Sequence, residues 1–262
     1  MSVTATKNGR LSLKDVELEV FHKGGGPALL LLHGGNGLDH RSRFLELLAE
    51  RFEVIAPSHP GFGHSPLPDR FDSVDDLAYL YLDLLDACDL RDVVLMGFSL
   101  GGWIAAEVAI RCAHRLSKLI LVGPVGIKIS DRETRDIPDI FATSPDDLVR
   151  LVFHDPRNGV VDYGALSDEE LQIIARNRES LALYTWEPYM HNPRLRYHLD
   201  RIRIPTLMIR GASDGLVSQA YAQAYAALIP GARVEVIDEA GHVPQIEQPE
   251  EFVRRVIGFA TN

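Results

Sequence analysis

Short, continuous apolar runs recur along the chain and alternate with stretches whose apolar residues are spaced three or four apart. Such runs are typical of strands covered on both faces of a sheet, and the wider spacing is typical of helices. The runs fall at residues 28–32, 52–56, 93–98 and 116–122, and the helical spacing at 41–51, 73–87 and 100–113. This alternation predicts a parallel sheet with helices on both faces, because right-handed crossovers place them there.

The pattern changes between residues 124 and 200, where charged, proline and aromatic residues cluster and we expect two to four helices. An alternating stretch at 16–22 precedes the core and predicts a half-exposed edge strand. After the change come predicted strands at 205–210 and 233–237 and predicted helices at 219–228 and 249–259. The chain is therefore predicted to be an α/β protein with a mostly parallel sheet of about eight strands and a helical cap inserted after the sixth strand. The expected division is a first core part at 1–123, the cap at 124–200 and a second core part at 201–262.

Charge and cysteine content limit which binding partners and which cellular compartment we expect for this chain. The net charge of −10 argues against nucleic acid or an anionic membrane as the main partner. Cys88 and Cys112, the two cysteines, fall within predicted helices and are expected to be reduced and packed. Residues 1–8 contain no apolar leader and no stretch has the length of a membrane span, so we expect a cytoplasmic location. Self-association into a homo-oligomer is compatible with these features.

The apolar run at 93–98 stops at Ser99 within Gly97-Phe98-Ser99-Leu100-Gly101 and is followed by a predicted helix. This is the sequence form of a nucleophile elbow, G-x-S-x-G between a strand and a helix. A turn that sharp strains the serine backbone, and side chains at Gly97 and Gly101 would collide with the flanking elements. The helix that follows would direct its free N–H groups toward negative charge near Ser99.

A serine hydroxyl needs a base, and the base needs an orienting group. His242 follows the last predicted strand in a loop at the carboxyl edge of the sheet, the edge at which Ser99 also lies. Asp214 ends a strand and turn at the same edge. An oxyanion formed at Ser99 would need two donors, and the N–H groups of Leu100 and Gly35 can supply them. The sequence therefore predicts a serine, acid and histidine site in that chain order.

With these motifs the chain resembles the α/β-hydrolase fold superfamily. His33-Gly34-Gly35 is similar to the oxyanion loop of that family, residues 97–101 to its elbow, 211–214 to its acid turn and 241–242 to its histidine loop. The resemblance implies that Ser99 is the nucleophile, that His242 acts as general base and then acid, and that Asp214 fixes the His242 tautomer. The region at 124–200 corresponds to the variable cap of the family.

One loop departs from the family pattern. The segment 58–65 begins with Ser58 where the family normally has aspartate, which puts the local hydrogen bonding of this loop in question. His59 and His64 are spaced as metal ligands can be, but no convincing third ligand accompanies them. We therefore expect them to be scaffold beside the pocket and expect no metal. His33 is expected to brace the oxyanion loop.

Four residues are predicted to contact the substrate. Phe98 and Val243 flank the catalytic serine and histidine, at positions where hydrolases of ring-cleavage products usually have asparagine and tryptophan. Trp186 and Tyr189 are the best cap candidates to face the pocket, although packing of the cap onto the core is the favoured interpretation of their aromatic cluster.

These features predict a cofactor-free serine hydrolase that cleaves a carboxylic ester or lactone of a small molecule through an acyl-enzyme at Ser99. A serine elbow argues against the epoxide hydrolases and haloalkane dehalogenases of this fold, whose elbow carries aspartate. A carbon-carbon bond hydrolase of ring-cleavage products and a perhydrolase-like enzyme stay open as alternatives. From other classes, a small-molecule receptor and a catalytically silent scaffold on the same fold also stay open.

Overall fold

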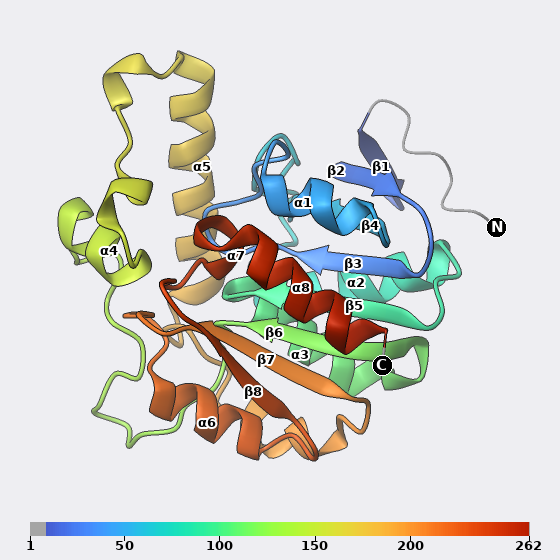
Figure 1. Cartoon of the computed structure of the whole chain (residues 1–262). Helices are drawn as coiled ribbons and strands as arrows, with labels where there is room; N and C mark the ends of the chain where they lie inside the picture. The colour runs from blue at the N-terminus through green and yellow to red at the C-terminus, as the bar shows by residue number, and fades with distance from the viewer. Residues whose placement is uncertain (1–8, 262) are drawn as a thin grey trace.

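A computed structural model describes residues 9–261 of the chain, so the N-terminal segment in which we find no apolar leader lies outside the described residues. Its centre is one sheet with the strand order β1-β2-β4-β3-β5-β6-β7-β8 (Figure 1). β1 and β2 pair antiparallel, as do β2 and β4, and the remaining neighbours are parallel. The strands are β1 (Arg10–Leu13), β2 (Val16–Gly24), β3 (Ala28–Leu32), β4 (Glu53–Pro57), β5 (Val93–Phe98), β6 (Leu116–Val122), β7 (Thr206–Gly211) and β8 (Arg233–Ile237). The predicted α/β architecture with a mostly parallel sheet is confirmed.

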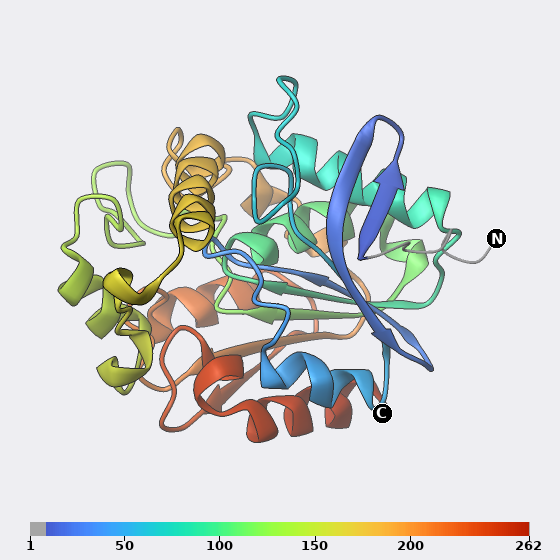
Figure 2. The same cartoon turned by 90° about the horizontal axis from the view of Figure 1, so that it is seen from above.

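Helices cover both faces of the sheet, which explains the continuous apolar runs of its strands. On β3, Leu30 and Leu32 belong to one buried apolar cluster, whereas Leu29 and Leu31 belong to the other. The first cluster includes side chains of α2 (Val74–Ala87), α3 (Leu100–Cys112) and α6 (Gln219–Ala227). The second includes side chains of α1 (Arg43–Ala49) and α8 (Pro249–Ala260), which pack together below the sheet in Figure 2.

The segment between β6 and β7, residues 124–200, which we call the insertion, contains α4 (Pro145–Val152) and α5 (Asp168–Thr185). In Figure 1, α5 rises beside the edge of the sheet at which the parallel strands end. Short 3-10 turns complete the described helices, at η1 (Ala113–Arg115), η2 (Pro156–Gly159), η3 (Tyr163–Ala165), η4 (Leu195–Tyr197) and η5 (Leu199–Arg201). The insertion therefore lies over the sheet edge at which Ser99, Asp214 and His242 were expected.

Two elements differ from the expectation. The stretch at 16–22 was expected to be an edge strand, but β1 pairs along β2 and is itself the edge, so β2 lies inside the sheet. Four residues of β1 are too few to show a period in the sequence. The residues of β2 alternate because one of its faces is buried and the other is more exposed, and this pattern does not show whether a further strand pairs along it. The loop expected after His242 also contains one helical turn, α7 (Pro244–Glu247).

Candidate active site

Ser99 stands at the junction of β5 and α3 with backbone angles of φ 50° and ψ −110°. Few residues other than glycine adopt this conformation, and it is held here because the Ser99 N–H donates to the Val122 carbonyl at 2.9 Å. A Cβ atom at Gly97 would collide with the Gly101 carbonyl, and one at Gly101 would collide with the Leu32 carbonyl. Both glycines are therefore required by close backbone approach, and the serine side chain stays partly exposed.

Asp214 and His242 are hydrogen-bonded to each other. His242 Nδ1 lies 3.0 Å from Asp214 Oδ2, and the two side chains are 7% and 0% exposed. The other carboxylate oxygen of Asp214 accepts the N–H groups of Leu216 at 2.9 Å and Val217 at 2.8 Å. An acceptor at Nδ1 favours the His242 tautomer whose Nε2 has a free lone pair, the form that a general base needs.

The far nitrogen of His242 is buried without a hydrogen-bond partner among the described residues. Ser99 Oγ is therefore not hydrogen-bonded to His242 Nε2 in this structure. Gly123 lies between them: its predecessor Val122 accepts the Ser99 N–H, and a Cβ at Gly123 would lie 3.1 Å from the His242 ring. Gly123 has φ +48°, so both its backbone angle and its surroundings require glycine.

The turn that carries Asp214 is braced by a buried arginine that the sequence did not single out. The Arg210 guanidinium donates to the carbonyls of Asp214 at 3.4 Å and Val217 at 3.5 Å, and Arg210 is only 5% exposed. The sequence does contain a signal for this role, namely a charged residue within the apolar strand β7. A charged side chain in a strand covered on both faces needs buried partners.

The loop after β3 brings bare backbone to Ser99. A Cβ at Gly34 would lie 3.4 Å from the Ser99 Cβ. The Gly34 carbonyl is bonded to the His33 ring at 2.7 Å and accepts the Gly37 N–H at 3.1 Å. The Gly35 N–H belongs to the same planar peptide as this carbonyl and therefore points the opposite way. The Gly35 N–H therefore points away from the His33 ring and the Gly37 N–H, which both bond to the Gly34 carbonyl.

His33 and His59 stack beneath this loop with ring centroids 3.8 Å apart. The backbone N–H of His59 donates to His33 Nε2 at 2.9 Å, so the His33 proton must be on Nδ1, where it donates to the Gly34 carbonyl. His59 in turn contacts the Tyr81 hydroxyl and the His33 carbonyl. Burial lowers the pKa of His33 to about 4 and the pKa of His59 well below its ordinary value. The pair is neutral, and both His59 nitrogens bond to the protein.

The loop at 58–65 begins with Ser58 where the family normally has aspartate, and a carboxylate from another part of the chain bonds to the loop. Glu19 of β2 reaches the loop, where its Oε2 accepts the Ser58 hydroxyl at 3.0 Å and the His64 N–H at 3.1 Å. The backbone N–H of Glu19 also donates to Ser65 Oγ at 3.0 Å. The Glu19 carboxylate, from a strand beside this loop, therefore accepts the hydrogen bonds of the loop. Sequence motifs alone could not reveal this contact.

Helix α5 closes over both glycine-containing loops through buried polar contacts. Asn177 Oδ1 accepts the Gly63 N–H at 2.9 Å, and Asn177 Nδ2 donates to the Asn36 carbonyl at 2.8 Å. One turn further, the Ser180 hydroxyl donates to the Gly61 carbonyl at 2.7 Å. A Cβ at Gly35 would lie 2.5 Å from a methyl group of Leu181, so this leucine covers the Gly35 backbone.

The residues expected to contact substrate lie in different surroundings. Phe98 is buried and packs against Phe44 and Phe252, with ring centroids 5.7 Å away in each case. Trp186 is 57% exposed and lies against Phe141, whereas the Tyr189 hydroxyl bonds to the backbone of Pro138 and Ile140. Val243 is half-buried and precedes α7. The contacts of Phe98 and Tyr189 are those of packing residues.

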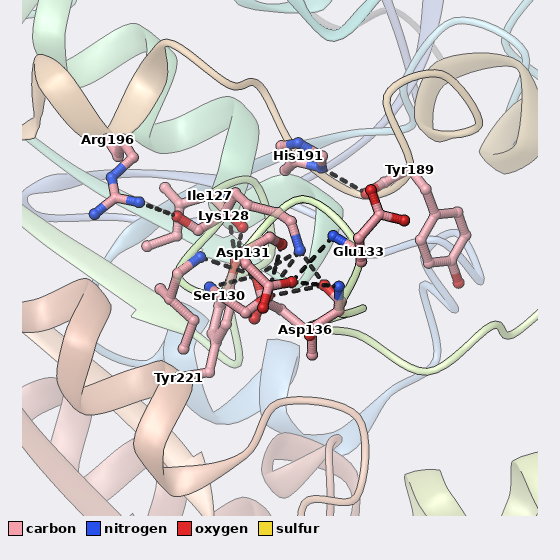
Figure 3. Close-up of polar contacts among 12 residues, drawn as sticks. Ile127, Lys128, Ser130, Asp131, Glu133, Asp136, Tyr189, His191, Arg196 and Tyr221 are labelled. Carbon is pink, nitrogen blue, oxygen red and sulfur yellow. Dashed lines mark hydrogen bonds and ion pairs between the residues drawn. The ribbon is translucent and has the colours of Figure 1, made fainter.

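The insertion begins with a loop organised around a lysine (Figure 3). The Lys128 ammonium contacts Ser130 Oγ at 2.8 Å, Asp136 Oδ2 at 3.6 Å and the Thr134 carbonyl. Asp136 also accepts the Ile129 N–H at 2.8 Å. Tyr221 of α6 holds the start of this loop, because its hydroxyl bonds to both the N–H and the carbonyl of Ile127. The loop that follows Gly123 is therefore anchored to the core.

Comparison with known proteins identifies the family of this chain. A family model described as the alpha/beta hydrolase family matches residues 29–255. The chain belongs to the alpha/beta hydrolase family. The match spans the elbow, the acid turn, the histidine loop and the insertion alike.

Relatives in this family are named for different activities. A pimeloyl-[acyl-carrier protein] methyl ester esterase of Aromatoleum aromaticum is 28% identical over 86% of this chain and 94% of its own. A 2-hydroxy-6-oxo-2,4-heptadienoate hydrolase of Pseudomonas putida is 28% identical over 96% of this chain and 95% of its own. The solved 2-hydroxy-6-oxo-6-phenylhexa-2,4-dienoate hydrolase of a Rhodococcus strain shares the fold, with a TM-score of 0.78 at 21% identity over 97% of this chain and 98% of its own. Membership of this family identifies the chain as a hydrolase.

Among residues 9–261, no group of three or more histidine, cysteine, aspartate or glutamate side chains could hold a metal ion. None of the helices in that range is both long and apolar enough to cross a bilayer.

Proposed function

We propose that this chain is a serine hydrolase that cleaves a carboxylic ester or lactone of a small molecule through an acyl-enzyme at Ser99. The observation that carries the proposal is the buried Asp214–His242 hydrogen bond of 3.0 Å, which leaves His242 Nε2 without a partner at the edge of the sheet where β5 ends at the strained Ser99. A buried polar atom without a partner is costly, and it is explained if Nε2 receives the Ser99 proton during the reaction.

In this mechanism Ser99 Oγ attacks the substrate carbonyl carbon while its proton moves to His242 Nε2. The carbonyl electron pair moves to oxygen, and the N–H groups of Leu100 and Gly35 stabilise that oxyanion. Asp214 stabilises the imidazolium formed at His242. The carbonyl then re-forms as the alkoxide leaves with the proton from His242, and water activated by His242 releases the acid and regenerates Ser99.

An acyl substrate is favoured over a ring-cleavage dienoate by two residues. Phe98 packs into the core between Phe44 and Phe252, and Val243 has no polar group, so neither position supplies the polar or indole contact that we expect in carbon-carbon bond hydrolases. Relatives with the two activities are equally similar to this chain in sequence identity, so the choice rests on these two residues. We propose that no cofactor takes part, because the three side chains supply the nucleophile, base and orienting group themselves.

Hydrolysis of p-nitrophenyl acetate by the wild type and by Ser99→Ala tests the proposal. We expect the variant to lose at least about a thousandfold in kcat/KM, since the nucleophile is removed. Ser12→Ala, which alters an exposed serine of β1, is the control and should keep the wild-type rate. Equal rates for wild type and Ser99→Ala would contradict the proposal. A single-turnover burst with negligible steady-state turnover would instead favour a receptor on this fold.

A further inference from the structure

A short part of the insertion, residues 151–155, lies across the two loops that carry Asp214 and His242, and we call it the strap. The Leu151 carbonyl accepts the Gly215 N–H at 2.9 Å, next to Asp214. The Val152 carbonyl accepts the His242 N–H at 2.6 Å. A Cβ at Gly241 would collide with that same carbonyl, so the histidine loop is in direct contact with the strap.

Glu247 of α7 joins the strap to the histidine loop from the other side. Its Oε2 accepts the Gly241 N–H at 2.6 Å and the His154 N–H at 3.1 Å. Its Oε1 accepts the Asp155 N–H at 3.0 Å and the Asn158 side-chain amide at 3.4 Å. Within residues 9–261, no ion pair involves Glu247, so the carboxylate is satisfied by N–H donors alone. Hydrogen bonds to an ionised acceptor are about twice as strong as neutral ones.

We infer that Glu247 is a positioning residue for the general base, and this inference rests on the proposed function. The carboxylate holds Gly241 on one side of the loop, the Val152 carbonyl holds the His242 backbone, and Asp214 holds the imidazole. Three independent contacts therefore fix the direction of Nε2, and two of them depend on the strap. The position of the insertion over the core is therefore coupled to the position of His242.

The chain offers a matched control beside Glu247. A cavity of about 390 Å³ is lined by both Glu247 and Glu239. Glu239 is exposed, and its described contact is a backbone carbonyl that accepts the Gln248 amide at 3.2 Å. Glu239→Gln thus removes one negative charge from the same surface without removing a bond to the histidine loop.

Steady-state kinetics on p-nitrophenyl acetate would separate positioning from binding. We expect Glu247→Ala to lower kcat about 10- to 100-fold, because a small displacement of a catalytic group costs that much. KM should change by less than about twofold, since no substrate contact is lost. Glu247→Gln keeps one acceptor oxygen and should fall between Glu247→Ala and wild type, whereas Glu239→Gln should match wild type.

A measurement independent of turnover is the low-field proton resonance of His242 Nδ1–H, assigned by its absence in His242→Ala. We expect it to shift or broaden in Glu247→Ala and, less strongly, in Glu247→Gln. An unchanged resonance in both Glu247 variants, or an unchanged kcat while the wild type is active, would overturn the inference. A wild type without Ser99-dependent turnover would refute the proposed function instead, and the resonance would still decide the role of Glu247.

Discussion

The core loops and the insertion differ in how their residues are held, although both lie at the same edge of the sheet. In the core, Ser99, Asp214 and His242 each follow a strand, so the strand pairing brings them to one edge of the sheet, where the strap and Glu247 then hold the His242 loop. The insertion has no strand in the sheet and is held by side-chain bonds to loop backbone, such as those of Asn177, Ser180 and Glu247. The sheet therefore brings the candidate catalytic residues to one edge, and hydrogen bonds to the loops around those residues hold the insertion over them.

The largest expected effect is on the core side of this comparison. Gly123→Ala would put a methyl group 3.1 Å from the His242 ring and 3.3 Å from Asp214 Oδ2, at a residue with φ +48°. We expect kcat/KM to fall about 100-fold or more, because the imidazole must move. Gly231→Ala, at φ +76° with open space around the Cβ, carries similar backbone strain far from the site and is the control. Equal loss of activity in both variants would show that strain, and not the His242 contact, is responsible.

A smaller effect is expected where the insertion meets the core. Asn177→Ala removes the acceptor of the Gly63 N–H and the donor to the Asn36 carbonyl, so two hydrogen bonds between the insertion and the core loops are lost. We expect a loss of about 2 to 3 kcal/mol in the free energy of unfolding, measured with urea. Gln172→Ala, on an exposed position of α5, should leave that free energy unchanged. A wild-type value for Asn177→Ala would mean that the insertion is held independently of these loops.

The smallest expected effect concerns the neutral histidine pair beneath the oxyanion loop. Because burial lowers the pKa of His33 to about 4 from 6.5, the folded chain binds fewer protons than the unfolded chain between these values. The stability that His33 contributes is therefore complete above pH 6.5 and is lost as the pH falls toward 4, by about 2 kcal/mol at pH 5. Half-buried carboxylates such as Asp155 and Glu251, whose arginine partners lower their pKa values to about 2, lose their contribution only at lower pH.

Urea unfolding at pH 7 and pH 5 would measure this dependence. His33→Gln should show a smaller loss between the two pH values than the wild type. His198→Gln, at an exposed position, should keep the wild-type loss. Identical pH dependence in His33→Gln and wild type would exclude His33 as its source.

Much of the core was predictable because local patterns determine it. Apolar runs located β3, β5 and β6 at their observed bounds, and the strand predicted at 233–237 is β8. The helix expected at 73–87 is α2, which begins after its N-cap Ser73, whose side chain accepts the Asp76 N–H at 3.3 Å. The residues proposed for catalysis also follow strands, so their motifs lay at recognisable places. Their catalytic roles stay predictions until activity is measured.

The supporting contacts were not predictable from single-sequence motifs. Glu19 acts on a loop about 40 residues away, and the three insertion residues that donate to Glu247 lie 89 to 93 residues before it in the chain. Such pairs have no common period or spacing, because tertiary packing alone brings them together. The same reason left the substrate residues of the insertion unresolved, since Trp186 and Tyr189 sit in an irregular aromatic cluster.

Covalent labelling of Ser99 tests the central claim most directly. An organophosphonate ester probe should add its mass to the peptide that contains Ser99, and peptide mass spectrometry would locate it. Labelling should be strong in the wild type and nearly absent in His242→Ala, since the base activates the serine. Mass on another serine, or equal labelling of Ser99 in wild type and His242→Ala, would contradict the account.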